Sequence, residues 1–197
     1  MKKSILLVAS LMLFLGSGCD SFLDETNYSD VTSEGGYYDT EEGLNAIVNA
    51  CYTPLRFWAG KEDAIGLSET GTDIIAAASG CVDNNMAAYT QSLDGTNSAC
   101  TFYFDRFYAA INWCNTAIFH AQTVPNPSND EILATTLNKR EAEARVLRTF
   151  YYWILTETFG DTYYTDQPST SIVMNPVKTS TDNIYQYMFD DLDWAIK

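Results

Sequence analysis

The sequence predicts an all-α fold of tetratricopeptide-like stacked helix pairs with long loops. Three segments, at about residues 40–58, 101–122 and 128–159, space their apolar residues three or four positions apart, and a fourth begins near residue 180. This spacing places the apolar side chains on one face of a helix. No segment of any length shows the alternation that is typical of a strand. Helix pairs of this size favour tetratricopeptide-like stacking, although no clean repeat is visible.

The first nineteen residues have the layout of a secretory signal. Lys2 and Lys3 precede an apolar run over residues 5–15, and small residues then lead directly into Cys19. A spanning helix needs about 20 apolar residues, so this run is too short to cross a membrane. A cysteine at this place resembles the acylated residue of a bacterial lipoprotein, which makes Cys19 the expected lipidation site. An ordinary signal peptide followed by a chance cysteine is the alternative.

These patterns divide the chain into three parts. We expect a lipoprotein signal peptide over residues 1–18, an acidic tether over 19–39 and a helical domain over 40–197. The last helical pattern is still running at Lys197 without a cap or stop signal. We therefore expect the domain to be truncated at its C-terminal end.

The chain is strongly acidic, with a formal net charge of −15. Such a surface repels phosphate backbones and anionic headgroups, which argues against nucleic-acid binding and against membrane contact beyond a lipid anchor. A neutral or cationic ligand is easier to accommodate. The chain also holds 13 Tyr, 10 Phe and 4 Trp, which is more aromatic surface than a small core requires.

The cysteines and the single histidine provide almost no ligands for a metal. The chain has no C-x-x-C motif, and His120 is its only histidine, so we expect neither a metal nor a cofactor. Cys51 and Cys114 fall on apolar helix faces, where they are expected to pack as small hydrophobes. Cys81 and Cys100 lie in a predicted loop region of an exported protein, where either a disulfide or two free thiols is possible.

The first helix is expected to begin after Thr40, an acceptable N-cap followed by two glutamates. Pro54 interrupts the pattern, yet the apolar spacing continues to Trp58, which favours a kink over a clean stop. Residues 59–100 are rich in Gly, Ser, Thr, Asn and Asp and predict mostly loop with one short helix.

The second and third helices each carry polar residues for which we favour a structural role. On the second helix Phe104, Tyr108 and Asn115 are expected on one face, with Asn115 as a buried, hydrogen-bonded amide. The third helix is expected to start at a capping box of Ser128 and Glu131 and to end before a left-handed Gly160. It is apolar nearly all round in its second half, which predicts a central place in the stack.

Charged residues of the third helix are interpreted as an ion-pair system. Glu141 and Arg145 stand four residues apart in the favourable orientation, and Arg148 lies about one turn further along. After an extended connection over 161–179 the fourth helix begins at Ser180 or Thr181. Its acidic residues, Asp190, Asp191 and Asp193, are expected to be solvated surface.

The most recognisable stretch runs from Glu143 to Asp161. It contains E-A-R-V-L-R-T-F-Y-Y followed by F-G-D, and it resembles the SusD/RagB family of Bacteroidetes surface lipoproteins. Cys19 with Phe22-Leu23-Asp24, and the D-L-D of 191–193 after Tyr185, occur in the order that the family shows. The chain departs from the family pattern at Thr162-Tyr163-Tyr164, where an apolar residue and Pro are usual, and at Lys178, where Arg is common.

This resemblance implies a lipid-anchored protein on the outer surface of the outer membrane. Such a protein captures oligosaccharides and acts as a lid over a SusC-like TonB-dependent transporter, while some relatives take peptides instead. Aromatic platforms with nearby amides suit the apolar faces and the hydroxyls of sugars.

Two other classes of function compete with glycan capture. One is a helical-repeat scaffold or adhesin without glycan specificity. The other is a lipid-anchored glycoside hydrolase, but no G-x-S-x-G, H-E-x-x-H or phosphate-loop motif is present, so we expect no enzyme.

The residues that contact a ligand are expected within the long loop region before the second helix. Asn84, Asn85, Tyr89 and Tyr103 combine amides with aromatic faces there. Ordinary loop polarity and tyrosines at the edge of the core are the alternative interpretation for each of them.

Overall fold

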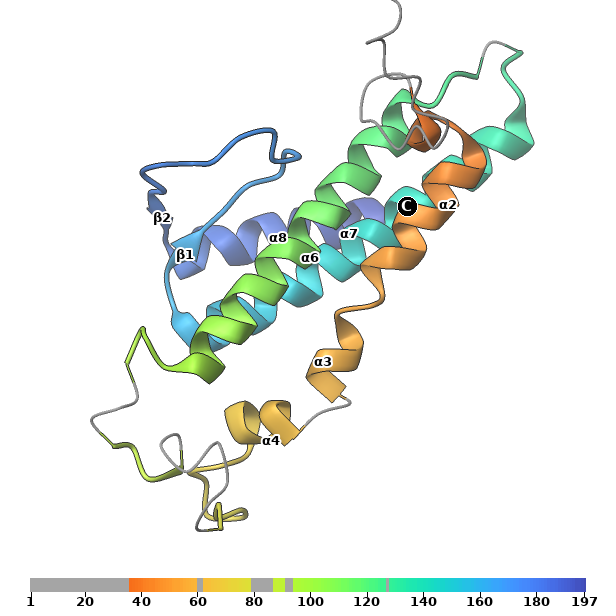
Figure 1. Cartoon of the computed structure of the whole chain (residues 1–197). Helices are drawn as coiled ribbons and strands as arrows, with labels where there is room; N and C mark the ends of the chain where they lie inside the picture. The colour runs from red at the N-terminus through yellow and green to blue at the C-terminus, as the bar shows by residue number, and fades with distance from the viewer. Residues whose placement is uncertain (1–35, 60–61, 79–86, 91–93, 127) are drawn as a thin grey trace, which may run out of the picture. The chain divides into compact units, whose positions relative to one another are not determined.

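The structure, a computed structural model, describes residues 36–59, 62–78, 87–90, 94–126 and 128–197. Most of these residues are helical, which confirms the predicted all-α class (Figure 1). The elements in chain order are η2 (Tyr37–Asp39), α2 (Glu41–Cys51), α3 (Leu55–Ala59), α4 (Glu62–Ser68), α6 (Ser98–Thr123), α7 (Glu131–Phe159), β1 (Thr162–Tyr163), β2 (Lys178–Thr179) and α8 (Thr181–Ile196).

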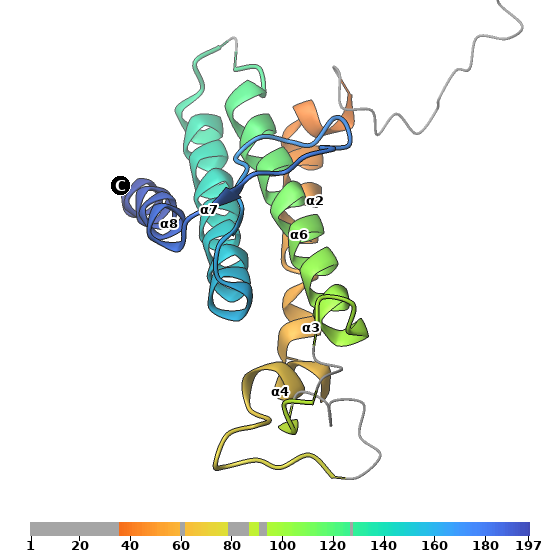
Figure 2. The same cartoon turned by 90° about the vertical axis from the view of Figure 1, so that its left-hand side faces the viewer.

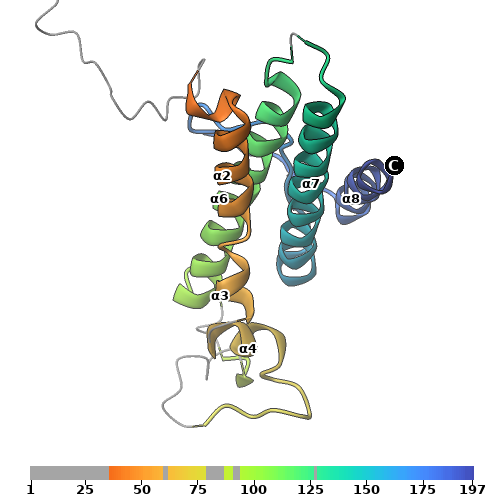
Figure 3. The ribbon, with the colours of Figure 1, turned by 90° about the vertical axis from the view of Figure 1, so that its right-hand side faces the viewer.

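The helix α7 lies in the middle of the stack, as its apolar composition predicts. It forms an antiparallel pair with α6, while α8 packs on its other side (Figure 2). The shorter α2 packs against α6 and also contacts α7 (Figure 3). The tetratricopeptide-like stacking of helix pairs is therefore confirmed.

Aromatic rings fill the centre of the core. The rings of Tyr103 and Phe107 stack with 5.9 Å between centroids, and Phe107 stacks on Tyr151 at 5.8 Å. All three side chains are fully buried. Cys51 and Cys114 are buried free thiols beside them, as their positions on apolar faces predict.

The helix α2 begins as predicted but ends earlier than predicted. The Thr40 hydroxyl accepts a hydrogen bond from the Gly43 amide at 3.0 Å, so Thr40 is the N-cap. The expected kinked helix to Trp58 is wrong, because α2 ends at Cys51 and α3 begins after Pro54. Proline lacks the amide that the helix would need there, and it disfavours helical geometry in the residue before it.

The ends of α7 also differ in detail from the prediction. Asp130, not Ser128, is the N-cap, and its Oδ1 accepts hydrogen bonds from the amides of Ile132 and Leu133 at 2.8 and 3.3 Å. An aspartate directly before the first helical residue also suits the positive end of the helix dipole. At the other end Gly160 has a φ of +70° but a ψ of −135°, which is outside the left-handed helical region.

The two apolar faces of α7 are not equally buried. Leu147, Tyr151 and Leu155 lie in the core, whereas Val146 and Trp153 remain 45% and 42% exposed. The apolar residues around α7 therefore form one face that is buried in the core and one face that is half exposed.

The connection after α7 contains two short strands that pair with each other. β1 and β2 are antiparallel, with Thr162 opposite Thr179 and Tyr163 opposite Lys178. The extended character of residues 161–179 was predictable, but this pairing was not, because two residues per strand give no sequence pattern.

We predict that Leu147→Ala lowers the free energy of unfolding by about 2 to 5 kcal/mol, because a buried leucine loses its packing and leaves a cavity. Chemical denaturation monitored by circular dichroism measures the loss. The matched control is Val146→Ala, the next residue on the same helix, for which we expect a change of less than about 1 kcal/mol since the side chain is half exposed. Equal losses in the two variants would contradict the assigned core face.

Candidate functional site

Two hollows lie beside the 161–179 connection, and both open over the same face of α6. On this face Phe104, Tyr108 and Asn112 form a stripe, because they stand four residues apart along the helix. The apolar spacing predicts both Phe104 and Tyr108 on the core face; Tyr108 does pack against the core, whereas Phe104 is 40% exposed. The stripe of Phe104, Tyr108 and Asn112 lies next to a fully buried stripe that contains Phe107 and Ile111.

The first hollow has a volume of about 430 Å³, within the usual range of small-molecule sites. The start of α6 and the loop before it contribute Gly95, Cys100, Thr101 and Phe104. The end of α7 and the connection contribute Phe159, Asp161, Thr162, Tyr163, Pro176 and Lys178.

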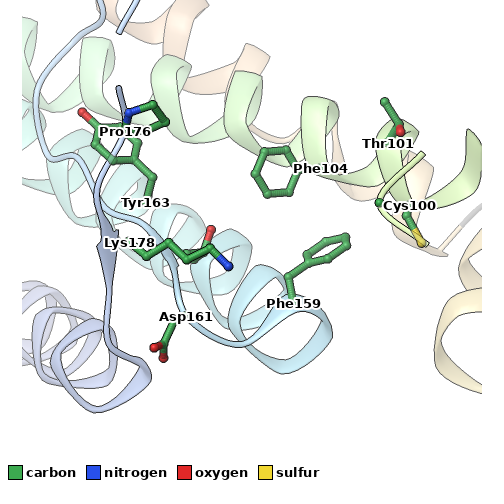
Figure 4. Close-up of a pocket in the computed structure, with 10 residues that line it drawn as sticks. Cys100, Thr101, Phe104, Phe159, Asp161, Tyr163, Pro176 and Lys178 are labelled. Atoms are coloured by element: carbon green, nitrogen blue, oxygen red, sulfur yellow. The ribbon is translucent and has the colours of Figure 1, made fainter. Parts of the chain in front are cut away.

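Three aromatic residues, Phe104, Phe159 and Tyr163, line this hollow. Phe104 and Phe159 meet edge to face with 5.5 Å between ring centroids. Figure 4 shows both rings on one side of the hollow, with Lys178 extending toward them from β2. Flat apolar rings arranged in this way offer a surface for the C–H face of a ligand.

The two charged groups of the first hollow are of opposite sign. The Asp161 carboxylate points toward α8 (Figure 4) and accepts hydrogen bonds from the Thr181 amide and hydroxyl at 2.9 and 3.0 Å. These hydrogen bonds, with the charge of Lys178, lower the pKa of Asp161. The carboxylate is thus ionised at neutral pH and is engaged at the start of α8, where the helix dipole favours a negative charge.

The second hollow lies further along α6 and has a volume of about 480 Å³. Its walls are Tyr108 and Asn112 of α6 and, from the connection, Tyr163, Thr165, Gln167, Pro168, Ser169, Thr170, Ser171 and Val173. Tyr163 lines both hollows. Amides, hydroxyls and two aromatic rings therefore surround the second hollow.

Hydrogen bonds from α6 hold the connection in place above the stripe. The Tyr108 hydroxyl donates to the Tyr163 carbonyl at 2.7 Å and is also bonded to the Thr162 hydroxyl. The Asn112 Oδ1 accepts from the Ser169 amide at 2.7 Å. Burial of the Tyr108 hydroxyl raises its pKa, so this anchor stays protonated at neutral pH.

A buried polar network supports the connection from below. Asn115 donates from Nδ2 to the carbonyls of Thr165 and Gln167, each at 3.1 Å, and its Oδ1 accepts from Arg148 at 2.8 Å. The Tyr152 hydroxyl adds a donated and an accepted hydrogen bond with the backbone of Thr165. Asn115 therefore fixes the walls of the second hollow.

Two arginines share one buried aspartate at the centre of this network. Arg148 contacts both carboxylate oxygens of Asp191, at 2.7 and 2.8 Å, and Arg145 contacts Oδ1 at 2.6 Å. Arg145 also pairs with Glu141 at 2.6 Å, and Glu141 accepts from Gln122. Burial alone would lower the pKa of Arg148, but Asp191 outweighs it and raises the pKa.

The expectation that Asp191 is solvated surface is wrong. Asp191 is 5% exposed and lies on the stripe of α8 that also buries Ile184 and Met188. The sequence carried this signal, since these residues are spaced four and then three apart. The neighbouring Asp190 and Asp193 are exposed, as expected.

Of the four predicted ligand-contact residues, the structure describes Tyr89 and Tyr103, and these two differ in burial. Tyr103 is fully buried against Phe102 and Phe107, so it is a core residue and not a binding platform. Tyr89 is 72% exposed and lies beside Gly71. Asn84 and Asn85 lie outside the described residues.

Two predictions on cysteines also depend on residues that the structure does not describe. Cys19 and Cys81 lie outside the described ranges. Cys100 is a free thiol at the edge of the first hollow. Among the described residues, no group of three His, Cys, Asp or Glu side chains could hold a metal ion, and no helix is long and apolar enough to cross a membrane.

We predict that Arg148→Lys destabilises the protein by at least about 2 kcal/mol, because a lysine cannot make the bidentate contact to Asp191 and also reach Asn115. Denaturant unfolding measures the change. Arg140→Lys is the control, since Arg140 pairs with Glu143 at a partly exposed site, where such a pair contributes less than about 1 kcal/mol. If Arg148→Lys were as stable as the unmodified protein, the network would not have the structural role assigned to it.

Comparisons with known proteins agree with this fold. A SusD-like family model described as "Starch-binding associating with outer membrane" matches residues 21–197. SusD-like protein P2 of Formosa agariphila is 24% identical over 200 residues, which cover 99% of this chain and 38% of that protein. Surface glycan-binding protein A from Bacteroides fluxus has a similar fold, with a TM-score of 0.56 and 17% identity over 80% of this chain and 33% of that one. The chain thus spans less than half the length of either relative.

Proposed function

This chain belongs to the SusD-like family, and we propose that it is a glycan-binding lipoprotein of the cell surface. The observation that carries the proposal is the first hollow, where Phe104, Phe159 and Tyr163 form an aromatic surface with one charge of each sign beside it. Such a surface suits a neutral sugar ring, whose C–H face packs on aromatic rings while its hydroxyls meet polar groups.

The proposed place of action follows from the family and from the start of the sequence. The family is described as associating with the outer membrane, and the first nineteen residues resemble a lipoprotein signal that ends at Cys19. We infer that the lipid on Cys19 holds the protein at the outer surface. There it delivers oligosaccharides to a SusC-like TonB-dependent transporter, the partner that the family resemblance implies.

A binding role is favoured over glycoside hydrolysis by the charges of the hollow. Hydrolysis by the usual mechanisms needs two carboxylates flanking the scissile bond. Among the described residues that line the first hollow, Asp161 supplies one carboxylate, and this group is already bonded to Thr181. The arrangement can hold a sugar but offers no acid and base pair.

We predict that Phe104→Ala weakens glycan binding about tenfold, a loss of about 1.4 kcal/mol, because one wall of the aromatic surface is removed. Isothermal titration calorimetry with maltohexaose, cellohexaose, xylohexaose and mannohexaose identifies which neutral glycan binds and measures the loss.

Phe119→Ala is the matched control for this experiment. Phe119 stands on the same helix and is 44% exposed, close to the 40% of Phe104, but it lies outside the lining of both hollows. We expect its affinity to equal that of the unmodified protein. Failure of all four hexaoses to bind would overturn the proposed function.

We also predict that Cys19→Ala releases the protein from the membrane fraction, since the several acyl chains of a lipoprotein stabilise insertion by about 0.8 kcal/mol per buried CH₂. Fractionation of cells in detergent-free, high-salt buffer measures the distribution. Cys100→Ala is the control and should stay with the membrane. Retention of the Cys19 variant would show that the anchor lies elsewhere.

A further inference from the structure

Two buried cysteines from different helices meet in the core, away from both hollows. Cys51 is the last residue of α2 and Cys114 lies in the middle of α6, and both side chains are 0% exposed within one hydrophobic cluster. The Cys51 thiol donates to the Ile47 carbonyl at 3.2 Å, and the Cys114 thiol is hydrogen-bonded to Cys51. Since the one proton of the Cys51 thiol is already donated, the Cys51 sulfur is the acceptor for Cys114. The two sulfurs therefore face each other as free thiols.

Of the two thiols, Cys51 is the one that a reagent from solvent can reach first. It stands at the end of its helix, and the next residues, Tyr52 and Thr53, are exposed. Helix ends open locally more readily than helix centres, and Cys114 has several turns of α6 on either side. The opening has to break the hydrogen bond that the Tyr151 hydroxyl donates to the Cys51 carbonyl at 2.6 Å. We therefore expect a slow reaction that begins at Cys51.

The surroundings of Cys114 make it a poor first nucleophile. Burial, together with the hydrogen bond to Cys51, raises the pKa of Cys114 well above its usual value. The thiolate, and not the thiol, attacks a disulfide. Cys114 thus stays protonated while the core is closed, and it can react only after Cys51 has been modified and has brought a disulfide next to it.

We propose that Cys51 and Cys114 are a redox site, which a small disulfide such as oxidised glutathione converts into a reversible intramolecular disulfide. The Cys51 thiolate attacks one sulfur of the oxidant, so that a mixed disulfide forms and the first glutathione leaves. The Cys114 sulfur then attacks the Cys51 sulfur, and the second glutathione leaves. Two protein thiols are oxidised, one glutathione disulfide is reduced, and the protons of the two protein thiols end on the two glutathione thiols.

The bond fastens α2 to α6, and it is independent of glycan binding. In the unfolded chain it closes a loop of about 60 residues, which lowers the entropy of the unfolded state and so stabilises the folded one. A disulfide is permitted in an exported protein, and the signal-like start of the sequence predicts export. We therefore expect the oxidised protein to melt at a temperature at least about 5 °C higher than the reduced protein.

The test is oxidation of the folded protein, extracted in detergent and fully reduced beforehand. After incubation with oxidised glutathione, free thiols are blocked with N-ethylmaleimide, and tryptic peptides are mapped by mass spectrometry with and without reduction. We expect the peptide that contains Cys51 to be linked to the peptide that contains Cys114. Cys81 and Cys100 share a third tryptic peptide, so a bond between those two is not mistaken for this link.

Single variants test the order of the two steps. In Cys114→Ala we expect Cys51 to keep glutathione as a mixed disulfide, because no second thiol displaces it, whereas in Cys51→Ala we expect Cys114 to remain a free thiol. Both variants should lose the rise in melting temperature. Cys100→Ala is the control and should form the same link with the same rise. Free thiols at both positions after oxidation, a link that forms only in denaturant, or glutathione on Cys114 of the Cys51→Ala variant would overturn the proposal.

Discussion

The contact between Arg148 and Asp191 is the interaction on which the arrangement of the other elements depends. Both groups are almost completely buried, and a buried charge is costly unless it is paired and hydrogen-bonded. The guanidinium meets both carboxylate oxygens and still has a donor for Asn115. Because these residues come from α7, α8 and α6, pairing of the charges favours one register of the three helices. Breaking such a buried pair is strongly destabilising, because it leaves a buried charge without a partner.

The same network reaches the surface and shapes the second hollow. Arg148 fixes the amide of Asn115, and Asn115 in turn holds two carbonyl groups of the connection. Tyr152 and Tyr108 hold the connection at two further points. The walls that the connection contributes to the two hollows are therefore anchored to the buried core. Preorganisation of this kind lowers the entropic cost of ordering the walls when a ligand binds.

The sequence was sufficient to predict the helices, because local chemistry decides where a helix forms. Apolar spacing placed α2, α6, α7 and α8, and Thr40 and Ser180 mark the starts of two of them. The sequence was less informative where the conformation of a residue depends on contacts with residues far away in the chain. Pro54 could have kinked a helix or ended it, and Tyr103 could have faced a ligand or the core.

The candidate site could not be predicted, because it depends on the course of the 161–179 connection. That course is set by long-range bonds, such as those from Tyr108 and Asn112, which no local pattern reveals. Two signals were nevertheless present. The four-residue spacing of Phe104, Tyr108 and Asn112 marks a second face on α6, and Asp191 continues the apolar stripe of Ile184 and Met188 on α8.

The acidic surface is compatible with two hollows whose own lining residues carry no net charge. Charges more than about 8 Å away are largely screened at physiological salt, so the net charge of the chain contributes little inside these hollows. At longer range, the same charge disfavours anionic glycans and anionic lipid surfaces. A neutral oligosaccharide gains no electrostatic attraction in return. Its affinity has to come from packing on aromatic rings and from hydrogen bonds to amides and hydroxyls, which are the groups that line the two hollows.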